Sequence, residues 1–79
     1  MGRPLTTWWV EFSYSYEYYD EEENKWFKEN EFDAQRFTCK KDTIKENVEA
    51  WVIEELEFED YKNLKIKITD FYPTTDSEV

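Results

Sequence analysis

The stretch that decides the fold is WWVEFSYSYEYYDEEE, residues 8–23, in which large side chains alternate with mostly small or polar ones before a run of acids. Successive side chains of a β-strand point to opposite faces, so a period of two predicts a strand, here over residues 7–19. The polar residues 20–24 predict a turn, although they lack the glycine of the tightest hairpins. One face of this strand carries Trp8, Val10, Phe12, Tyr14, Tyr16 and Tyr18, whereas Trp9 and Tyr19 fall on the other.

Residues 25–40 predict the returning strand of an antiparallel hairpin, since strands adjacent in sequence usually pair. Trp26 and Phe32 share one parity along this segment, while Phe37 and Cys39 share the other. One regular strand cannot place both pairs on the same face, so we expect a bulge near residues 33–36. A helical turn through FDAQRF is the alternative.

A helix is predicted to follow. Thr43 and Glu46 fit a capping box, with Asp42 as the alternative cap. The pattern should end near Phe58, and the acids at 54–60 crowd the helix C-terminus, where the helix dipole disfavours them. The predicted apolar stripe consists of Ile44, Val48, Trp51, Val52 and Leu56.

Residues 64–72 alternate again, with Leu64, Ile66 and Ile68 expected to point inward, and Pro73 is expected to end this strand. Its outward Lys65 and Lys67 would share a face with acids of the first strand. We therefore predict an α+β fold of order ββαβ, with a three-stranded antiparallel or mixed sheet in strand order 2-1-3, one helix on one face and a long β-hairpin arm. Residues 1–79 should form a single domain, ordered over about 7–72, with a frayed tail at 73–79.

The composition restricts the function. Ten basic and twenty acidic residues give a formal charge of −10, which repels DNA, RNA and anionic lipid and favours a basic protein partner. An aromatic content of 20% argues against disorder. We therefore expect no direct binding of nucleic acid or membrane.

The residue types also argue against catalysis. There is no histidine, and Cys39 is the only cysteine, so we expect no metal, no cofactor, no internal disulfide and no enzyme activity. Cys39 is expected to be a core residue. No apolar run is long enough to span a membrane, and MGRPLTT lacks the apolar run of a signal peptide, which predicts a cytoplasmic protein.

The lengths of the predicted elements leave aromatic residues without cover. A strand of about 12 residues is roughly 40 Å long, whereas a helix of about 15 residues is roughly 22 Å long. The helix should stop covering the strand around Tyr14, leaving Tyr16, Tyr18 and Trp26 as aromatic anchors for a partner. The alternatives are that the hairpin coils back over itself, or that residues 25–37 fold across it as a lid.

The acids suggest where a basic partner would bind. Alternate strand residues lie about 6.8 Å apart, close to the phosphate spacing of a DNA strand, so the row formed by Glu29, Glu31 and Asp33 could imitate DNA. Glu21, Glu22 and Glu23 extend the negative charge to the predicted turn. Ile53, surrounded by acids on the outer side of the helix, is a second docking position, or an ordinary exposed aliphatic residue.

The tyrosine-rich strand, the acidic turn, RFTCKKDTIKENVEAWVIEELE and YKNLKIKITDFYP together resemble the small acidic ββαβ proteins of bacteriophages. The resemblance covers about residues 8–73 and implies an inhibitor of the anti-CRISPR or DNA-mimic kind, acting in the host cytoplasm. We therefore expect a non-enzymatic inhibitor of a basic, nucleic-acid-binding host protein. The alternative is an assembly module that forms a homodimer through the aromatic hairpin. The expected contact residues are Tyr16, Tyr18, Glu21, Glu22, Glu23, Trp26, Glu29 and Glu31.

Overall fold

The computed structural model describes residues 5–74. Its strands form one sheet of order β2-β1-β3, in which both pairings are antiparallel. The predicted ββαβ order and the 2-1-3 arrangement are therefore confirmed, and of the two predicted alternatives the sheet is the antiparallel one throughout. The elements are β1 (Thr6–Asp20), β2 (Lys25–Cys39), a 3-10 turn (Lys41–Thr43), α1 (Ile44–Glu55) and β3 (Tyr61–Pro73).

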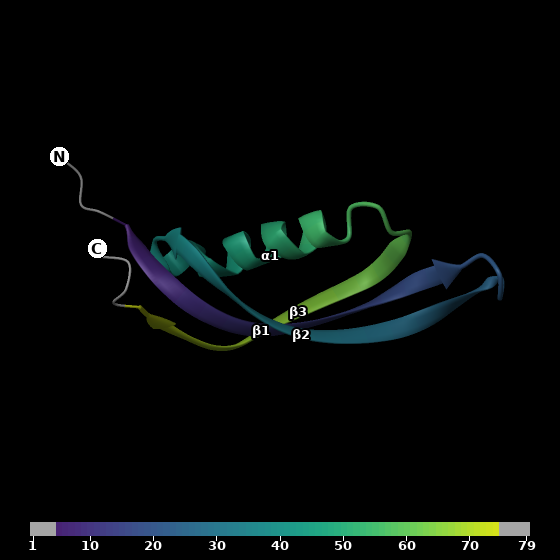
Figure 1. Cartoon of the computed structure of the whole chain (residues 1–79), viewed down its shortest axis with the longest axis horizontal. Coiled ribbons are helices and arrows are strands. Elements are labelled where there is room, and N and C mark those ends of the chain that lie inside the picture. The colour runs from purple at the N-terminus through teal and green to yellow at the C-terminus, as the bar shows by residue number, and fades with distance from the viewer. Residues whose placement is uncertain (1–4, 75–79) are drawn as a thin grey trace.

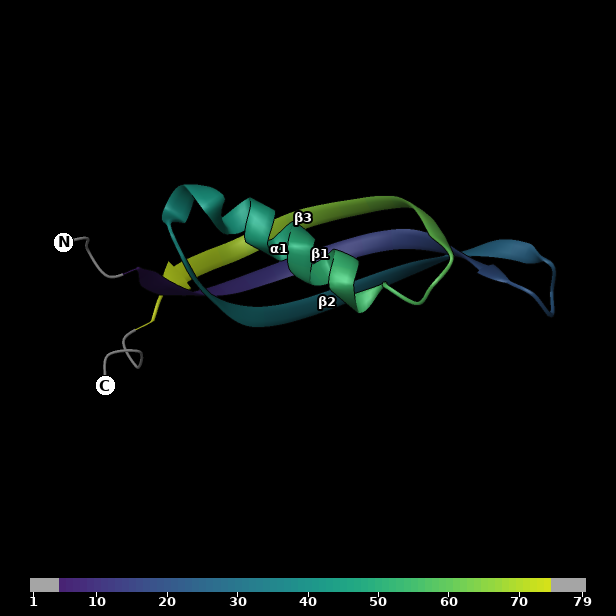
Figure 2. The ribbon, with the colours of Figure 1, turned by 90° about the horizontal axis from the view of Figure 1, so that it is seen from above.

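The molecule is elongated, with extents of 54 × 22 × 21 Å. Figure 1 shows α1 lying on the concave side of a curved sheet, over the half that contains the start of β1 and the end of β3. Seen from above, the turn between β1 and β2 lies at the opposite end, beyond both α1 and β3 (Figure 2). No described element covers the convex face of the sheet, so the two faces have different surroundings.

Strand β2 pairs with β1 in one unbroken register, from Thr6 opposite Cys39 to Asp20 opposite Lys25. The bulge predicted near residues 33–36 is therefore wrong, and so is the alternative helical turn. A regular ladder places Phe37 and Cys39 on the helix side and leaves Phe32 66% exposed on the other face. The backbone hydrogen bonds of an unbroken ladder therefore stabilise the fold more than burial of the single Phe32 side chain would.

The irregular strand is β3. Its register against β1 shifts between Glu11 and Phe12 and again between Ser15 and Glu17. At the second shift Asn63 has a φ of 57°, and its amide donates a 2.9 Å hydrogen bond to Glu17. At the first shift the Thr69 hydroxyl donates to the Glu11 carbonyl oxygen at 3.0 Å. Such bulges increase the twist of a strand, in keeping with the curvature of this sheet.

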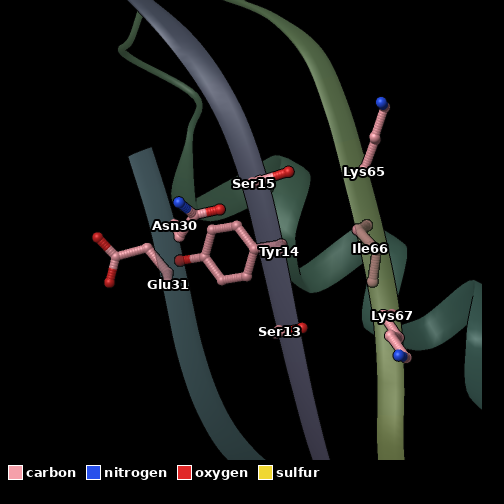
Figure 3. Close-up of a pocket in the computed structure, with 8 residues that line it drawn as sticks. All are labelled: Ser13, Tyr14, Ser15, Asn30, Glu31, Lys65, Ile66 and Lys67. Atoms are coloured by element: carbon pink, nitrogen blue, oxygen red, sulfur yellow. The ribbon is translucent and has the colours of Figure 1, made fainter. Parts of the chain in front are cut away.

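Tyr14 illustrates how the three strands line up. It lies in the central strand, opposite Glu31 of β2 on one side and Ile66 of β3 on the other. In Figure 3 its ring extends towards β2, with the hydroxyl directed at Glu31. Residues that face each other across neighbouring strands share one face of the sheet, so this register fixes which side chains meet.

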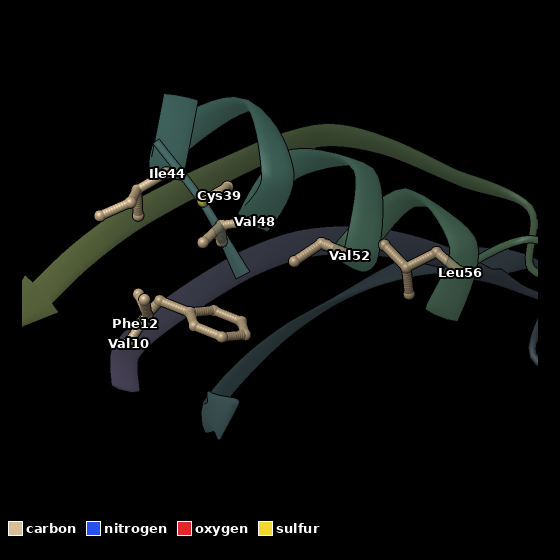
Figure 4. Packing of buried hydrophobic residues seen from close by; sticks show 7 residues of the cluster. All are labelled: Val10, Phe12, Cys39, Ile44, Val48, Val52 and Leu56. Carbon is tan, nitrogen blue, oxygen red and sulfur yellow. The ribbon is translucent and has the colours of Figure 1, made fainter. Parts of the chain in front are cut away.

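The core lies between α1 and the sheet half beneath it (Figure 4). The predicted helix stripe and the burial of Cys39 are confirmed, with Trp51 half-buried against the core at 5.4 Å from the Phe12 ring. Leu64, Ile66 and Ile68 of β3 also pack against this cluster, as expected. The fully or nearly fully buried residues are Val10, Phe12, Cys39, Ile44, Val48, Val52 and Leu56.

The helix begins after Thr43, but neither the predicted capping box nor the alternative cap at Asp42 forms. The 3-10 turn before α1 brings the Lys40 carbonyl oxygen within reach, and the Thr43 hydroxyl donates to it at 2.9 Å. Asn47 in turn donates its side-chain amide to the Thr43 carbonyl oxygen at 2.8 Å. Because its hydroxyl is used in this way, Thr43 does not cap the free amides of the first helical turn.

Both chain ends lie partly outside the described residues. The MGRP segment falls there, as do residues 75–79 of the tail that was expected to fray. Strand β3 ends at Pro73 as predicted, and the amide of Thr74 still donates to the Thr7 carbonyl oxygen at 3.0 Å. Between residues 5 and 74, no helix is long and apolar enough to cross a membrane.

Candidate binding surface

A ladder of tyrosines runs along β1 on the face that carries the helix. Tyr14 and Tyr16 stack with ring centroids 6.1 Å apart, and Tyr16 and Tyr18 follow at 6.4 Å. All three side chains are half-buried. We refer to Tyr14, Tyr16 and Tyr18 as the tyrosine ladder, and Phe27 of β2 extends it at 5.9 Å from the Tyr18 ring.

Acids of β2 lie beside this ladder on the same face. Glu31 is opposite Tyr14, Glu29 is opposite Tyr16, and Asp33 is opposite Phe12. We refer to Glu29, Glu31 and Asp33 as the acidic row. The sequence predicted the row but not its position, because the expected bulge concealed that these odd-numbered residues share the parity of Phe37 and Cys39. That shared parity was the available signal.

The electrostatics of the ladder follow from this arrangement. Burial raises the pKa of the Tyr14 hydroxyl above its usual value, and the Glu31 carboxylate raises it further. The pKa of Tyr16 is also raised, first by burial and then by Glu31 and Glu29. A negative tyrosinate is disfavoured next to carboxylates, and a cation is favoured there for the same reason. The surface therefore combines aromatic rings with negative potential.

Trp26 does not belong to this surface. It lies opposite Tyr19 on the other face of the sheet, with the two rings 5.3 Å apart in an edge-to-face arrangement. The Lys62 ammonium lies 4.2 Å from the Trp26 ring centroid. The structure thus brings Tyr16, Tyr18, Glu29 and Glu31 together, and it places Trp26 behind them.

The predicted acidic turn is present, and Glu21, Glu22 and Glu23 are all exposed in it. One carboxylate oxygen of Asp20 accepts hydrogen bonds from the amides of Glu22 at 2.9 Å and Glu23 at 3.1 Å. Asn24 has a φ of 59° and takes the left-handed conformation that glycine usually supplies in tight hairpins. These bonds hold the three glutamates at the far end of the molecule, beyond the ladder.

The positions of β2 and β3 decide how open the ladder is. Residues 25–37 lie within β2 in the plane of the sheet, so the predicted alternative of a lid is wrong. Strand β3 accompanies β1 as far as the pair Tyr18–Tyr61, and the Tyr61 ring meets the Tyr16 ring edge-to-face at 6.5 Å. The hairpin extends past β3 only over residues 19–26.

The convex face carries several lysines beside the exposed rings of Trp26 and Phe32. Lys65 lies opposite Ser15 and Lys67 opposite Ser13, so both lysines share the convex face with Glu11 and Glu17 as predicted, although the lysine directly opposite Glu17 is Lys62.

Across residues 5–74, no group of three or more Cys, Asp or Glu side chains is arranged to hold a metal ion. No protein family, no curated protein and no solved structure matches this chain.

Proposed function

We propose that this protein is a non-enzymatic binding protein that engages a basic partner protein through the tyrosine ladder and the acidic row. One observation carries the proposal: half-exposed Tyr16 and exposed or half-exposed carboxylates alternate across two adjacent strands of a single face. Among residues 5–74, the residues opposite Glu29 and Glu31 in the neighbouring strand are Tyr16 and Tyr14, so neither carboxylate faces a cation there.

The chemistry of such a face suits lysine and arginine side chains. A carboxylate accepts charge-assisted hydrogen bonds from a guanidinium or an ammonium group, and a neighbouring tyrosine ring attracts the same cation through its π face. Tyrosine is also enriched among residues that dominate binding energy. A face that offers both groups side by side would bind cationic side chains better than either group alone.

A nucleic-acid-binding protein is the partner class that fits best. The formal charge of −10 favours association with a strongly basic surface, and alternate acids of β2 have a spacing close to that of DNA phosphates. We propose that the chain acts as an inhibitor of the phage-encoded type by occupying a site meant for nucleic acid. The hairpin turn with Glu21, Glu22 and Glu23 would extend the contact as an arm.

Affinity capture tests this proposal. The immobilised protein would be exposed to a nuclease-treated bacterial lysate and eluted with rising salt, and each captured protein would be purified and titrated. We expect a nucleic-acid-binding protein whose affinity falls steeply with ionic strength and whose binding is competed by DNA.

Charge-reversal variants locate the contact. Glu29→Lys with Glu31→Lys should weaken binding of the purified partner by at least about tenfold, since each close ion pair contributes on the order of 1 kcal/mol or more. Asp42→Lys with Asp70→Lys makes the same charge change, in the 3-10 turn and near the end of β3, and should leave most of the affinity intact. Equal losses in both variants, or binding independent of salt, would contradict the proposal.

A homodimer is the second candidate, and the position of β2 favours it. This strand of 15 residues lies at an edge of the sheet, with one side of its backbone free of a neighbouring strand among the described residues. Sedimentation distinguishes the two functions. Tyr16→Asp with Tyr18→Asp should convert a dimer to a monomer under this candidate, whereas under the leading proposal the solution mass stays constant while partner binding falls.

A further inference from the structure

A second surface lies on the side of α1 turned away from the core. Ala50, Ile53 and Glu54 of α1, together with Glu57 and Tyr61, line an open groove there. Ile53 is 50% exposed, and Phe58, next to Glu57 in the chain, is 94% exposed. We refer to these lining residues, together with Phe58 as the residue that follows Glu57 in the chain, as the helix groove.

The groove is surrounded by negative charge. The segment from 46 to 61, ENVEAWVIEELEFEDY, has no lysine or arginine. Its carboxylates therefore have no cationic side chain within the segment itself. Several of them crowd the C-terminal end of α1, where the helix dipole is also negative. The acids are Glu46, Glu49, Glu54, Glu55, Glu57, Glu59 and Asp60.

Two unfavourable placements therefore coincide at one site. Large apolar side chains are left in water at Ile53 and Phe58, and like charges are crowded around them. A ligand that covers the apolar side chains and supplies positive charge would relieve both at once. The groove is also continuous with the tyrosine ladder, because Tyr61 lines the groove and contacts the Tyr16 ring.

We propose that the helix groove docks a cationic segment of a partner protein, one that carries large apolar side chains between its lysines or arginines. This inference deepens the proposed function, on whose basic partner it rests, and it assigns the apolar part of the recognition to Ile53 and Phe58. Charge complementarity selects this occupant. DNA, RNA and anionic lipid would be repelled by the acids, and a second copy of the chain carries the same charge of −10.

Two synthetic peptides of equal length and charge make the test specific. One places leucines among lysines at helical spacing, and the other has serine at every leucine position. Fluorescence anisotropy at several salt concentrations would give both affinities. We expect the wild-type protein to bind the Lys/Leu peptide at least about tenfold more tightly than the Lys/Ser peptide, because only the former covers apolar surface. Equal affinities would overturn the proposal, since the acids alone would then explain the binding.

Matched variants place the contact. Ile53→Asn with Phe58→Asn should reduce the preference for the Lys/Leu peptide to about threefold or less. Phe32→Asn, which alters a phenylalanine 66% exposed on the convex face, should leave that preference unchanged. Both proteins should retain the urea midpoint of the wild type, since neither site is buried. An unchanged preference in the groove variant would overturn the proposal.

The ladder variant separates this inference from the proposed function. If Tyr16→Ser with Tyr18→Ser abolishes the leucine preference and the groove variant does not, the groove proposal fails while the proposed function stands. If the groove variant alone abolishes it, the groove proposal is supported. A dimer of the free protein that dissociates on Ile53→Asn with Phe58→Asn would assign the groove to a second copy and overturn the proposal.

Discussion

Tyr16 of β1 and Glu29 of β2 lie directly opposite each other on the face of the sheet that carries the helix. This relationship turns what the sequence presents as two separate features, an aromatic strand and an acidic strand, into one mixed surface. It also explains why the pKa of Tyr16 is raised by Glu29 and Glu31 in addition to burial.

The titration of the ladder should report this arrangement. Tyr14 and Tyr16 should ionise above the pH at which free tyrosine does, about 10, and Glu31→Gln should lower the pKa of both. Absorbance of tyrosinate during an alkaline titration measures this. Glu23→Gln, at the exposed turn, is the control and should leave both pKa values unchanged.

Stability at high pH follows from the same shifts. Unfolded tyrosines lose their protons near pH 10, before Tyr14 and Tyr16 of the folded chain, so the folded state holds more protons above that pH. The stabilisation is therefore fully present below pH 10 and is lost as the pH rises through the folded pKa values. Urea unfolding at several alkaline pH values should show this decline, and a flat profile would contradict it.

Two phenylalanines should differ sharply in their contribution to stability. Phe12 is fully buried between the sheet and α1, so Phe12→Ala should cost about 3–5 kcal/mol of unfolding free energy. Phe32 is 66% exposed, and Phe32→Ala should change that free energy by less than about 0.5 kcal/mol. Tryptophan fluorescence during urea unfolding gives both values. A large loss for Phe32→Ala would show that the unbroken register of β2 is incorrect.

The left-handed backbone at Asn63 can be tested through the stability of two variants. Asn63→Ala and Asn63→Gly both remove the hydrogen bond to Glu17, but only alanine has a Cβ that opposes a φ of 57°. The alanine variant should therefore be less stable than the glycine variant by about 1 kcal/mol. Equal stabilities would mean that the bulge in β3 relaxes on substitution.

The contact between Lys62 and Trp26 should be measurable by a double-mutant cycle. With the ammonium 4.2 Å from the ring centroid, the coupling between Lys62→Met and Trp26→Leu should be about 0.5–1 kcal/mol. A control cycle that combines Lys67→Met with Trp26→Leu should give a coupling near zero, because Lys67 lies opposite Ser13. Similar values in both cycles would point to a general effect of charge.

Local patterns predicted the elements well. The alternation of residues 8–18 and 64–68 gave the first and third strands, and the 3.6-residue period from Ile44 to Leu56 gave the helix and its buried side. Each of these patterns is formed by side chains within a few residues of one another, so it can be read without knowing which distant residues pack against them. The strand order followed from connection rules that apply to any chain with this element order.

The site was predicted less completely, because it depends on which residues of different strands meet. Trp26 was expected beside Tyr16 and Tyr18, and the register places it on the opposite face. The row of Glu29, Glu31 and Asp33 was predicted without a position relative to the tyrosines, and the register places Glu29 and Glu31 opposite Tyr16 and Tyr14. The apolar residues of β2 did not reveal which of its faces is buried, since the strand buries Cys39 but leaves the larger and more apolar Phe32 exposed.

The sequence by itself determined the elements, their order, the apolar side of the helix and the excess of negative charge, because each is a property of neighbouring residues or of the whole composition. Only the tertiary structure decided that carboxylates flank the tyrosine ladder and that Ile53 and Phe58 lie exposed among acids. The physical reason is that backbone hydrogen bonding fixes a register for the whole strand at once. A shift of one residue would have moved every acid of β2 to the convex face.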